Sequence, residues 1–252
     1  MAKRVLGFMA HPDDVEIMCA GTLIRLKQEA GCEIIIATAT SGDCGSTQMG
    51  PQEITRVRHD EAMASARVIG AEYYCAGMID LFIMYDEPTL RRFIEIVRKA
   101  RPDIVITHPP SDYMIDHENV SHLVRTACFG APAPNCWTRD EDPAKPIAAV
   151  PHLYYADPVE LKTPFGEAVT PDFVVDITDV MATKEKMLAC HASQREWLRA
   201  HHGIDEYIEM MKRTAAQRGE LIGRPHGEGF RLHKGHPYPQ NNIIGELLGM
   251  KH

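Results

Sequence analysis

Long apolar runs are missing from this chain of 252 residues. No stretch approaches the roughly 18 residues that a membrane-spanning helix needs. The opening Met1-Ala2-Lys3-Arg4 leads directly into a short apolar run, without the apolar region of roughly 7–15 residues that is typical of a signal peptide. These absences predict a soluble, intracellular protein that does not associate with a membrane.

Excess positive charge is missing too. Lys and Arg number 27 and Asp and Glu 35, for a formal net charge of −8. No basic patch stands out, so we do not expect nucleic acid as a partner. The 7 cysteines form no Cys-x-x-Cys pair, and several lie in expected helices or strands, which predicts reduced thiols in a cytoplasmic protein. Cys44 lies in the Gly-rich loop Gly42–Ser46, where an inert or metal-adjacent thiol is favoured over a nucleophile, because no signature pairs it with a base.

Three catalytic signatures are absent, and each absence excludes a class of enzyme. The first apolar run is not followed by G-x-G-x-x-G, so the phosphate cradle of a dinucleotide-binding dehydrogenase is missing. The chain also lacks the G-x-S-x-G elbow of a serine hydrolase and the H-E-x-x-H helix of a zincin. Any hydrolytic chemistry must therefore use a different set of residues.

Short apolar runs alternate with helical patterns along most of the chain. This alternation predicts a single α/β domain over residues 1–252, although the length alone would permit two, with a mostly parallel, Rossmann-like sheet that has helices on both faces. The expected strands lie near Val5–Met9, Glu33–Ala39, Glu72–Cys75, Ile104–Thr107, Leu153–Tyr155 and Phe173–Asp176. The loops after the first and fourth strands should meet at the carboxyl edge of the sheet, where open α/β folds bind ligands.

The C-terminal part of the sequence is less regular. A helix is expected near Ile204–Arg218, and residues 219–252 are rich in Gly, Pro, His and basic residues, which predicts an irregular tail. Such a tail either covers the active site of its own or a neighbouring subunit or is loosely ordered, and we favour the covering role. The proline-rich segment Gly130–Pro151 is expected to be a long loop.

An imidazole and two carboxylates follow the first expected strand in Ala10-His11-Pro12-Asp13-Asp14-Val15-Glu16. His11 and Asp14 are three residues apart, so a turn that opens a helix places them on one side, where they suit a divalent ion such as zinc. Asp13 then points elsewhere and is free to act as a general base. The alternative is that Asp13 and Asp14 only cap a helix and that His11 is a surface histidine.

A catalytic zinc site typically takes three protein ligands, and a second cluster offers the third. The expected strand Ile104–Thr107 leads into His108-Pro109-Pro110-Ser111-Asp112-Tyr113-Met114-Ile115-Asp116-His117. His117 is the best candidate, because Asp116-His117 opens the next helix and repeats the first loop. Asp116 is expected to support a ligand, and Asp112 to bond a ligand or the substrate. His108 lies nearest the strand and is interpreted as a satisfied buried histidine.

Together these motifs resemble the PIG-L/LmbE-like family of metal-dependent N-deacetylases. Supporting matches cover roughly the first two hundred residues and lie in Thr40–Asp43, Arg58–Ala62, Ile69–Ala71, Pro171–Ile177 and His191–Gln194. The resemblance implies that His11, Asp14 and His117 bind zinc and that Asp13 is the base. It also implies that Arg58 reaches the acyl or sugar end of the substrate.

One position departs from the family pattern. Met114 stands where family members often carry a histidine, and a thioether cannot donate a hydrogen bond or a proton. His233 and His236 in the tail are candidates to replace that imidazole, from the same chain or across a symmetric interface, and we select His236. A metal- or sugar-binding relative without turnover is the alternative to an enzyme.

The combined prediction is a zinc-dependent amide hydrolase with Asp13, Arg58, Asp116 and His236 as its catalytic residues. It would remove the acyl group from a small N-acylated molecule such as an amino sugar. Iron, manganese or cobalt would also suit the ligands, and we expect a homo-oligomer.

Overall fold

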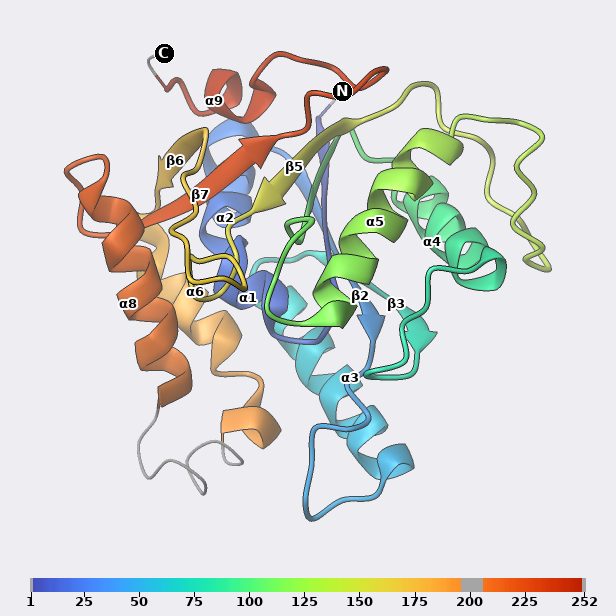
Figure 1. Cartoon of the computed structure of the whole chain (residues 1–252), viewed down its shortest axis with the longest axis horizontal. Coiled ribbons are helices and arrows are strands. Elements are labelled where there is room, and N and C mark those ends of the chain that lie inside the picture. The colour runs from blue at the N-terminus through green and yellow to red at the C-terminus, as the bar shows by residue number, and fades with distance from the viewer. Residues whose placement is uncertain (1, 196–205, 251–252) are drawn as a thin grey trace.

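The computed structural model describes residues 2–195 and 206–250. Its strands form one seven-stranded sheet in the order β3-β2-β1-β4-β5-β7-β6 (Figure 1). The strands are β1 (Arg4–Met9), β2 (Glu33–Thr40), β3 (Glu72–Met78), β4 (Ile104–Thr107), β5 (His152–Ala156), β6 (Phe173–Asp176) and β7 (Gly227–Leu232). β1 to β5 pair in parallel, whereas β7 is antiparallel to both β5 and β6. The predicted α/β fold with a mostly parallel sheet is confirmed.

The helices that connect these strands lie on both faces of the sheet (Figure 1). They are α1 (Asp14–Met18), α2 (Ala20–Ala30), α3 (Pro51–Val68), α4 (Glu87–Ala100), α5 (Ile115–Gly130), the short 3-10 helix η1 (Thr178–Val180), α6 (Met181–Leu188), α8 (Glu206–Glu220) and α9 (Ile243–Leu247). The helix expected near Ile204–Arg218 is α8, and positions 204 and 205 lie outside the described residues. Within the described ranges, no helix combines the length and apolar character needed to cross a membrane.

Alternation along β1 explains why both faces are covered. Val5 and Met9 pack into one apolar core with α2, α6 and α8, whereas Leu6 and Phe8 pack into the opposite core with α4 and α5. Successive side chains of a strand point to opposite faces, so a strand buried on both sides reads as one continuous apolar run. The first strand was recognisable for that reason.

The prediction of an irregular tail over residues 219–252 is wrong for residues 227–232, which form β7 inside the sheet. The prediction rested on the many Gly, Pro, His and basic residues of the tail, and Gly227, Glu228 and Gly229 lie among them. Gly229 passes so close to the Asp157 carboxylate that a Cβ atom there would clash. Glu228 is buried against the Lys184 ammonium and accepts hydrogen bonds from Gly21 N and Thr22 N at the start of α2. Gly229 and Glu228 therefore both serve the packing of β7.

Candidate active site

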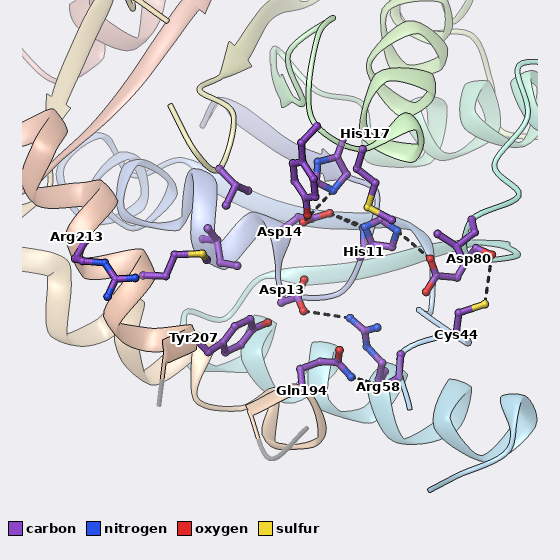
Figure 2. Close-up of a pocket in the computed structure, with 17 residues that line it drawn as sticks. His11, Asp13, Asp14, Cys44, Arg58, Asp80, His117, Gln194, Tyr207 and Arg213 are labelled. Atoms are coloured by element: carbon purple, nitrogen blue, oxygen red, sulfur yellow. Dashed lines mark hydrogen bonds and ion pairs between the residues drawn. The ribbon is translucent and has the colours of Figure 1, made fainter. Parts of the chain in front are cut away.

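Two loops at the carboxyl edge of the parallel strands bring the sequence motifs together. His11 lies in the loop from β1 to α1, Asp14 is the first residue of α1, and His117 lies in the first turn of α5, which follows β4 (Figure 2). β1 and β4 are neighbours in the sheet, so residues about a hundred positions apart in the sequence meet in one place. All three side chains are almost completely buried.

The distances within this triad suit a metal ion. One ligand atom from each of His11, Asp14 and His117 lies within 4.8 Å of the others. His11 Nδ1 lies 3.3 Å from Asp14 Oδ2, and His117 Nε2 lies 3.5 Å from Asp14 Oδ1. Ligand atoms bound at about 2.1 Å to a tetrahedral ion are separated by about 3.4 Å. The donor set of two imidazoles and one carboxylate therefore fits a divalent metal.

Asp13 is held apart from the triad by an unusual backbone conformation. Its φ of 109° lies in the left-handed region, which a non-glycine residue rarely adopts and which costs about 1–3 kcal/mol. The carboxylate accepts a hydrogen bond of 3.1 Å from Arg58 Nη2. Asp13 thus borders the metal candidates without belonging to their set of ligand atoms, and its role as the base stays a prediction.

Arg58 is an almost completely buried residue of α3 that lines the cavity beside Asp13. In addition to Asp13, its guanidinium donates to Pro12 O at 2.8 Å and to Gly42 O at 3.2 Å. Its predicted contact with substrate stays a prediction. The structure adds that Arg58 ties the Asp13 loop to the loop after β2.

Two carboxylates hold the far side of the His11 ring. His11 Nε2 lies 3.1 Å from Asp80 Oδ1 and 3.3 Å from Asp116 Oδ2, and Asp116 Oδ2 also accepts the backbone N–H of Leu81 at 2.8 Å. A carboxylate on the second nitrogen of a metal-binding histidine fixes its orientation and raises its basicity. The supporting position expected for Asp116 agrees with these contacts, whereas Asp80 was not anticipated from the sequence.

His108 is fully buried beneath the triad. Its Nε2 accepts the backbone N–H of Ala10 at 2.9 Å, and its ring stacks on His117 with centroids 3.9 Å apart. His108 Nδ1 has no hydrogen-bond partner among the described residues, so the residue is only partly satisfied. Asp112 Oδ1 lies 3.2 Å from His117 Nδ1 and supports that ring.

Burial and neighbouring charges shift the pKa values of His108, Asp14 and Asp13 in different directions. Burial and the neighbouring His117 lower the pKa of His108 to about 4. Burial would raise the pKa of Asp14, but His117 and His108 hold it well below its usual value. Burial raises the pKa of Asp13 in spite of the Arg58 charge. The Asp14 carboxylate therefore favours its charged form more strongly than the Asp13 carboxylate does.

A cavity of about 590 Å³ opens above these residues. One wall comes from α8, where Tyr207, Met210 and Arg213 line the cavity. Figure 2 shows Tyr207 and Arg213. The Tyr207 side chain is almost completely buried, and its hydroxyl lies beside the Asp13 carboxylate, with which it interacts. Met114 also lines the cavity, as does Cys44, whose thiol lies 3.6 Å from Asp80 O.

His236 is not brought to this cavity. Because β7 runs antiparallel to β5, the residues after Leu232 lie at the amino edge of the parallel strands, opposite the His11 loop. His236 is exposed there, and His233 contacts Tyr155 and Tyr238 instead. The prediction that His236 serves the site of its own chain is therefore wrong, and its cause was the failure to recognise β7.

The α8 wall was also missed. Tyr207, Met210 and Arg213 recur at three-residue intervals, a spacing that reads as an ordinary amphipathic helix. Asp80 gave a weak signal, since it follows the expected strand Glu72–Cys75 closely at the same sheet edge.

Comparisons with known proteins agree with this geometry. The family model described as PIG-L, GlcNAc-PI de-N-acetylase, matches residues 6–128. A diacetylchitobiose deacetylase of Thermococcus kodakarensis is 28% identical over 91% of this chain and 83% of its own length. A 4-oxalmesaconate hydratase of Pseudomonas putida is 28% identical over 86% of this chain and 80% of its own length.

A solved structure extends the likeness to three dimensions. The N,N'-diacetylchitobiose deacetylase from Pyrococcus horikoshii superposes with a TM-score of 0.77 at 27% identity, over 96% of this chain and 89% of that one. The matched family region contains both loops of the site and all three residues of the candidate metal triad. Residues 6–128 match the PIG-L family, and the chain is similar along most of its length to two diacetylchitobiose deacetylases, which are hydrolytic enzymes.

Proposed function

We propose that the protein is a zinc-dependent N-deacetylase that removes the acetyl group from an acetylated amino sugar or a related small molecule. The observation that carries the proposal is the buried triad of His11, Asp14 and His117 with the Asp13 carboxylate beside it. The names of the deacetylase relatives give acetylated sugars as their substrates, which supports this substrate class.

The triad would hold the ion, which when bound polarises the acyl oxygen and lowers the pKa of a water molecule. Asp13 takes a proton from that water molecule as the water oxygen forms a bond to the acyl carbon. The carbon–nitrogen bond then breaks, and Asp13 returns the proton to the amine nitrogen. Acetate and the free amine are the products, and the Asp13 carboxylate is regenerated.

Asp13 can perform this exchange only if its carboxylate keeps one orientation. Arg58 supplies that constraint, because its planar guanidinium bonds the carboxylate and two backbone oxygens simultaneously. Asp116 and Asp80 constrain His11 in the same way. We therefore assign Arg58 and Asp116 as positioning residues, and Arg58 keeps the substrate contact that the resemblance implies as a second role.

Negative charge that develops on the acyl oxygen needs a donor in addition to the ion. Met114 cannot provide one. Tyr207 is a buried hydroxyl that lines this cavity beside Asp13, so we assign the missing donor to Tyr207 in place of His236. Burial raises the pKa of Tyr207 well above its usual value, which keeps the proton on the phenol.

The test is a screen of the zinc-loaded protein against N-acetylated amino sugars, with released acetate and free amine both measured. Equal amounts of the two products support the proposal. Binding without release supports the metal- or sugar-binding alternative. The hydratase relative makes addition of water to an unsaturated acid the appropriate second assay.

Two further parts of the proposal concern the protein in its cell. The 7 cysteines of the chain are all free thiols in the structure, which supports a cytoplasmic location. We also propose a homo-oligomer, and sedimentation equilibrium would measure its mass against the 28.2 kDa of one chain.

A further inference from the structure

The segment between β3 and α4 presents an uncharged surface to its surroundings. Residues 79–85 carry a single charge, and that carboxylate, on Asp80, turns inward to lie 3.1 Å from His11 Nε2. The Ile83 side chain is buried as well. The other five side chains of the segment are apolar or aromatic and are 51–67% exposed: Ile79, Leu81, Phe82, Met84 and Tyr85.

These exposed side chains are held in place by the contacts of the segment with α5. Asn119 Nδ2 donates to Ile83 O at 2.8 Å, and the Tyr85 hydroxyl lies 2.9 Å from Thr126 Oγ1. Leu81 has a φ of 67°, which a non-glycine residue adopts only where the surrounding structure imposes it. The exposed apolar surface is therefore a fixed feature of the fold.

The start of α5 extends this surface. Ile115, Asn119 and Thr126 are spaced by about one and two turns, which places them on one face of the helix. Asn119 and Thr126 contact the segment, so Ile115, which is 60% exposed, lies on the same side. We call the combined surface the loop patch, and its members are Ile79, Leu81, Phe82, Met84, Tyr85 and Ile115.

A ligand in the catalytic cavity does not cover the loop patch. Leu81 lines that cavity, whereas the other five members are not among the described residues that line it. The patch therefore extends outward from the rim of the cavity over the surface of the protein. A molecule that covers the patch must bind from outside and borders the opening of the cavity.

The loop patch is large enough for a stable protein interface. At about 100 Å² of accessible surface for each member, it offers roughly 600 Å², which is at the upper limit for the surface of a monomeric protein. Two such patches in contact would bury about 1,200 Å² in total. That area reaches the lower limit of a standard protein–protein interface.

We propose that the loop patch binds the loop patch of a second copy of this chain, about a two-fold axis. Its members carry no charge, so a partner with charged groups there would lose their hydration without gaining ion pairs. A second copy offers the same uncharged surface, and a two-fold axis brings identical patches together. Because Leu81 also lines the catalytic cavity, each copy borders the opening of the other copy's site.

This inference rests on the proposed homo-oligomer and not on the deacetylase activity. Sedimentation equilibrium of the zinc-loaded protein, over about a hundredfold range of concentration, tests it. At the highest concentration we expect a mass of at least twice the 28.2 kDa of one chain. Phe82→Asp and Met84→Asp each place an unpaired carboxylate in the interface, so each should raise the dissociation constant at least about tenfold.

Two results would overturn the proposal. The first is a wild-type protein that has the mass of one chain at every concentration. The second is an oligomer whose dissociation constant neither substitution changes. Far-UV circular dichroism and zinc content verify that each variant is folded. Phe82→Ala adds a variant without a new charge, and it should raise the dissociation constant about five- to tenfold.

Leu221→Asp is the matched control. Leu221 is 59% exposed, as Met84 is, and it directly follows α8, which lies on the opposite side of the molecule from the segment between β3 and α4 (Figure 1). The same charge is thus introduced outside the loop patch, and the mass should not change. If Leu221→Asp separated the copies as effectively as the two patch variants, the loop patch would not be the interface.

The outcome is separable from that of the deacetylase proposal, because mass and acetate release are independent measurements. If acetate is released and the mass does not depend on Phe82, the deacetylase proposal stands and the interface fails. If the mass depends on Phe82 and no acetate is released, the reverse holds.

Discussion

The two halves of this sheet contribute to the site in different ways. In residues 4–130 every strand is parallel to its neighbours, and the residues of the candidate triad follow β1 and β4 directly. In residues 152–247 the antiparallel β7 adds to the sheet, and α8 covers the cavity with one helix face. The first half holds the candidate metal ligands and the proposed base, and the second half lines the cavity beside them.

The difference shows where function can be read from a sequence. A polar cluster at the end of an apolar strand is conspicuous, because stability does not require it. A helix face that lines a cavity has the same spacing as one that packs on a core. The predictions below test whether this division between the two halves holds.

Removing a metal ligand should have the largest effect. Changing His117 to Ala takes away one bond and the geometry of the others, so most of the metal and nearly all activity should be lost. Elemental analysis of the purified variant measures this directly. His122→Ala on the same helix is the control and should keep the metal. Stoichiometric zinc in His117→Ala would refute the ligand assignment.

Asp13→Asn should have the second-largest effect on activity. The amide keeps the size of the side chain but cannot accept the proton, so kcat should fall by roughly 10²–10⁴ while metal content is unchanged. The exposed Asp60 of α3 provides a control through Asp60→Asn. Should Asp13→Asn retain the wild-type kcat, the base must lie elsewhere.

Tyr207→Phe tests the contribution of the second half. Loss of the hydroxyl should reduce kcat by roughly 10²–10³, with little change in KM or metal content, if the phenol stabilises the oxyanion. Tyr85→Phe removes a hydroxyl that bonds Thr126 outside the cavity and should be nearly silent. An unchanged kcat in Tyr207→Phe would mean that α8 only forms a wall.

Arg58→Lys should have the smallest of these effects. The ammonium keeps the charge but cannot reach three oxygens at once, so kcat should fall by about tenfold through poorer placement of Asp13. The contact implied with substrate adds a rise in KM. Arg56→Lys, an exposed neighbour on α3, is the control. A larger defect in Arg56→Lys would reverse the assignment.

Much of the fold followed from the sequence because β1, β2 and β4 are buried on both faces and read as apolar runs. β7 could not be recognised, since its polarity comes from Glu228, whose charge is matched by Lys184 only after folding. The antiparallel direction of β7 then decided where His236 lies. One missed strand therefore misplaced one candidate residue.

The candidate site, like the fold, could be predicted from the sequence only in part. His11, Asp14 and His117 were identifiable because each stands in a dense polar cluster after a strand. Asp80 stands alone among apolar residues, and Tyr207 lies in an ordinary amphipathic helical pattern. Only the tertiary structure shows which ring or cavity they face.

Acetate release by the protein before and after chelation tests the central claim most directly. The zinc-loaded enzyme should release one acetate for each free amine from an N-acetylated amino sugar, lose that activity when the metal is removed, and regain it when zinc is restored. Acetate release that continues unchanged after complete removal of the metal would contradict the account.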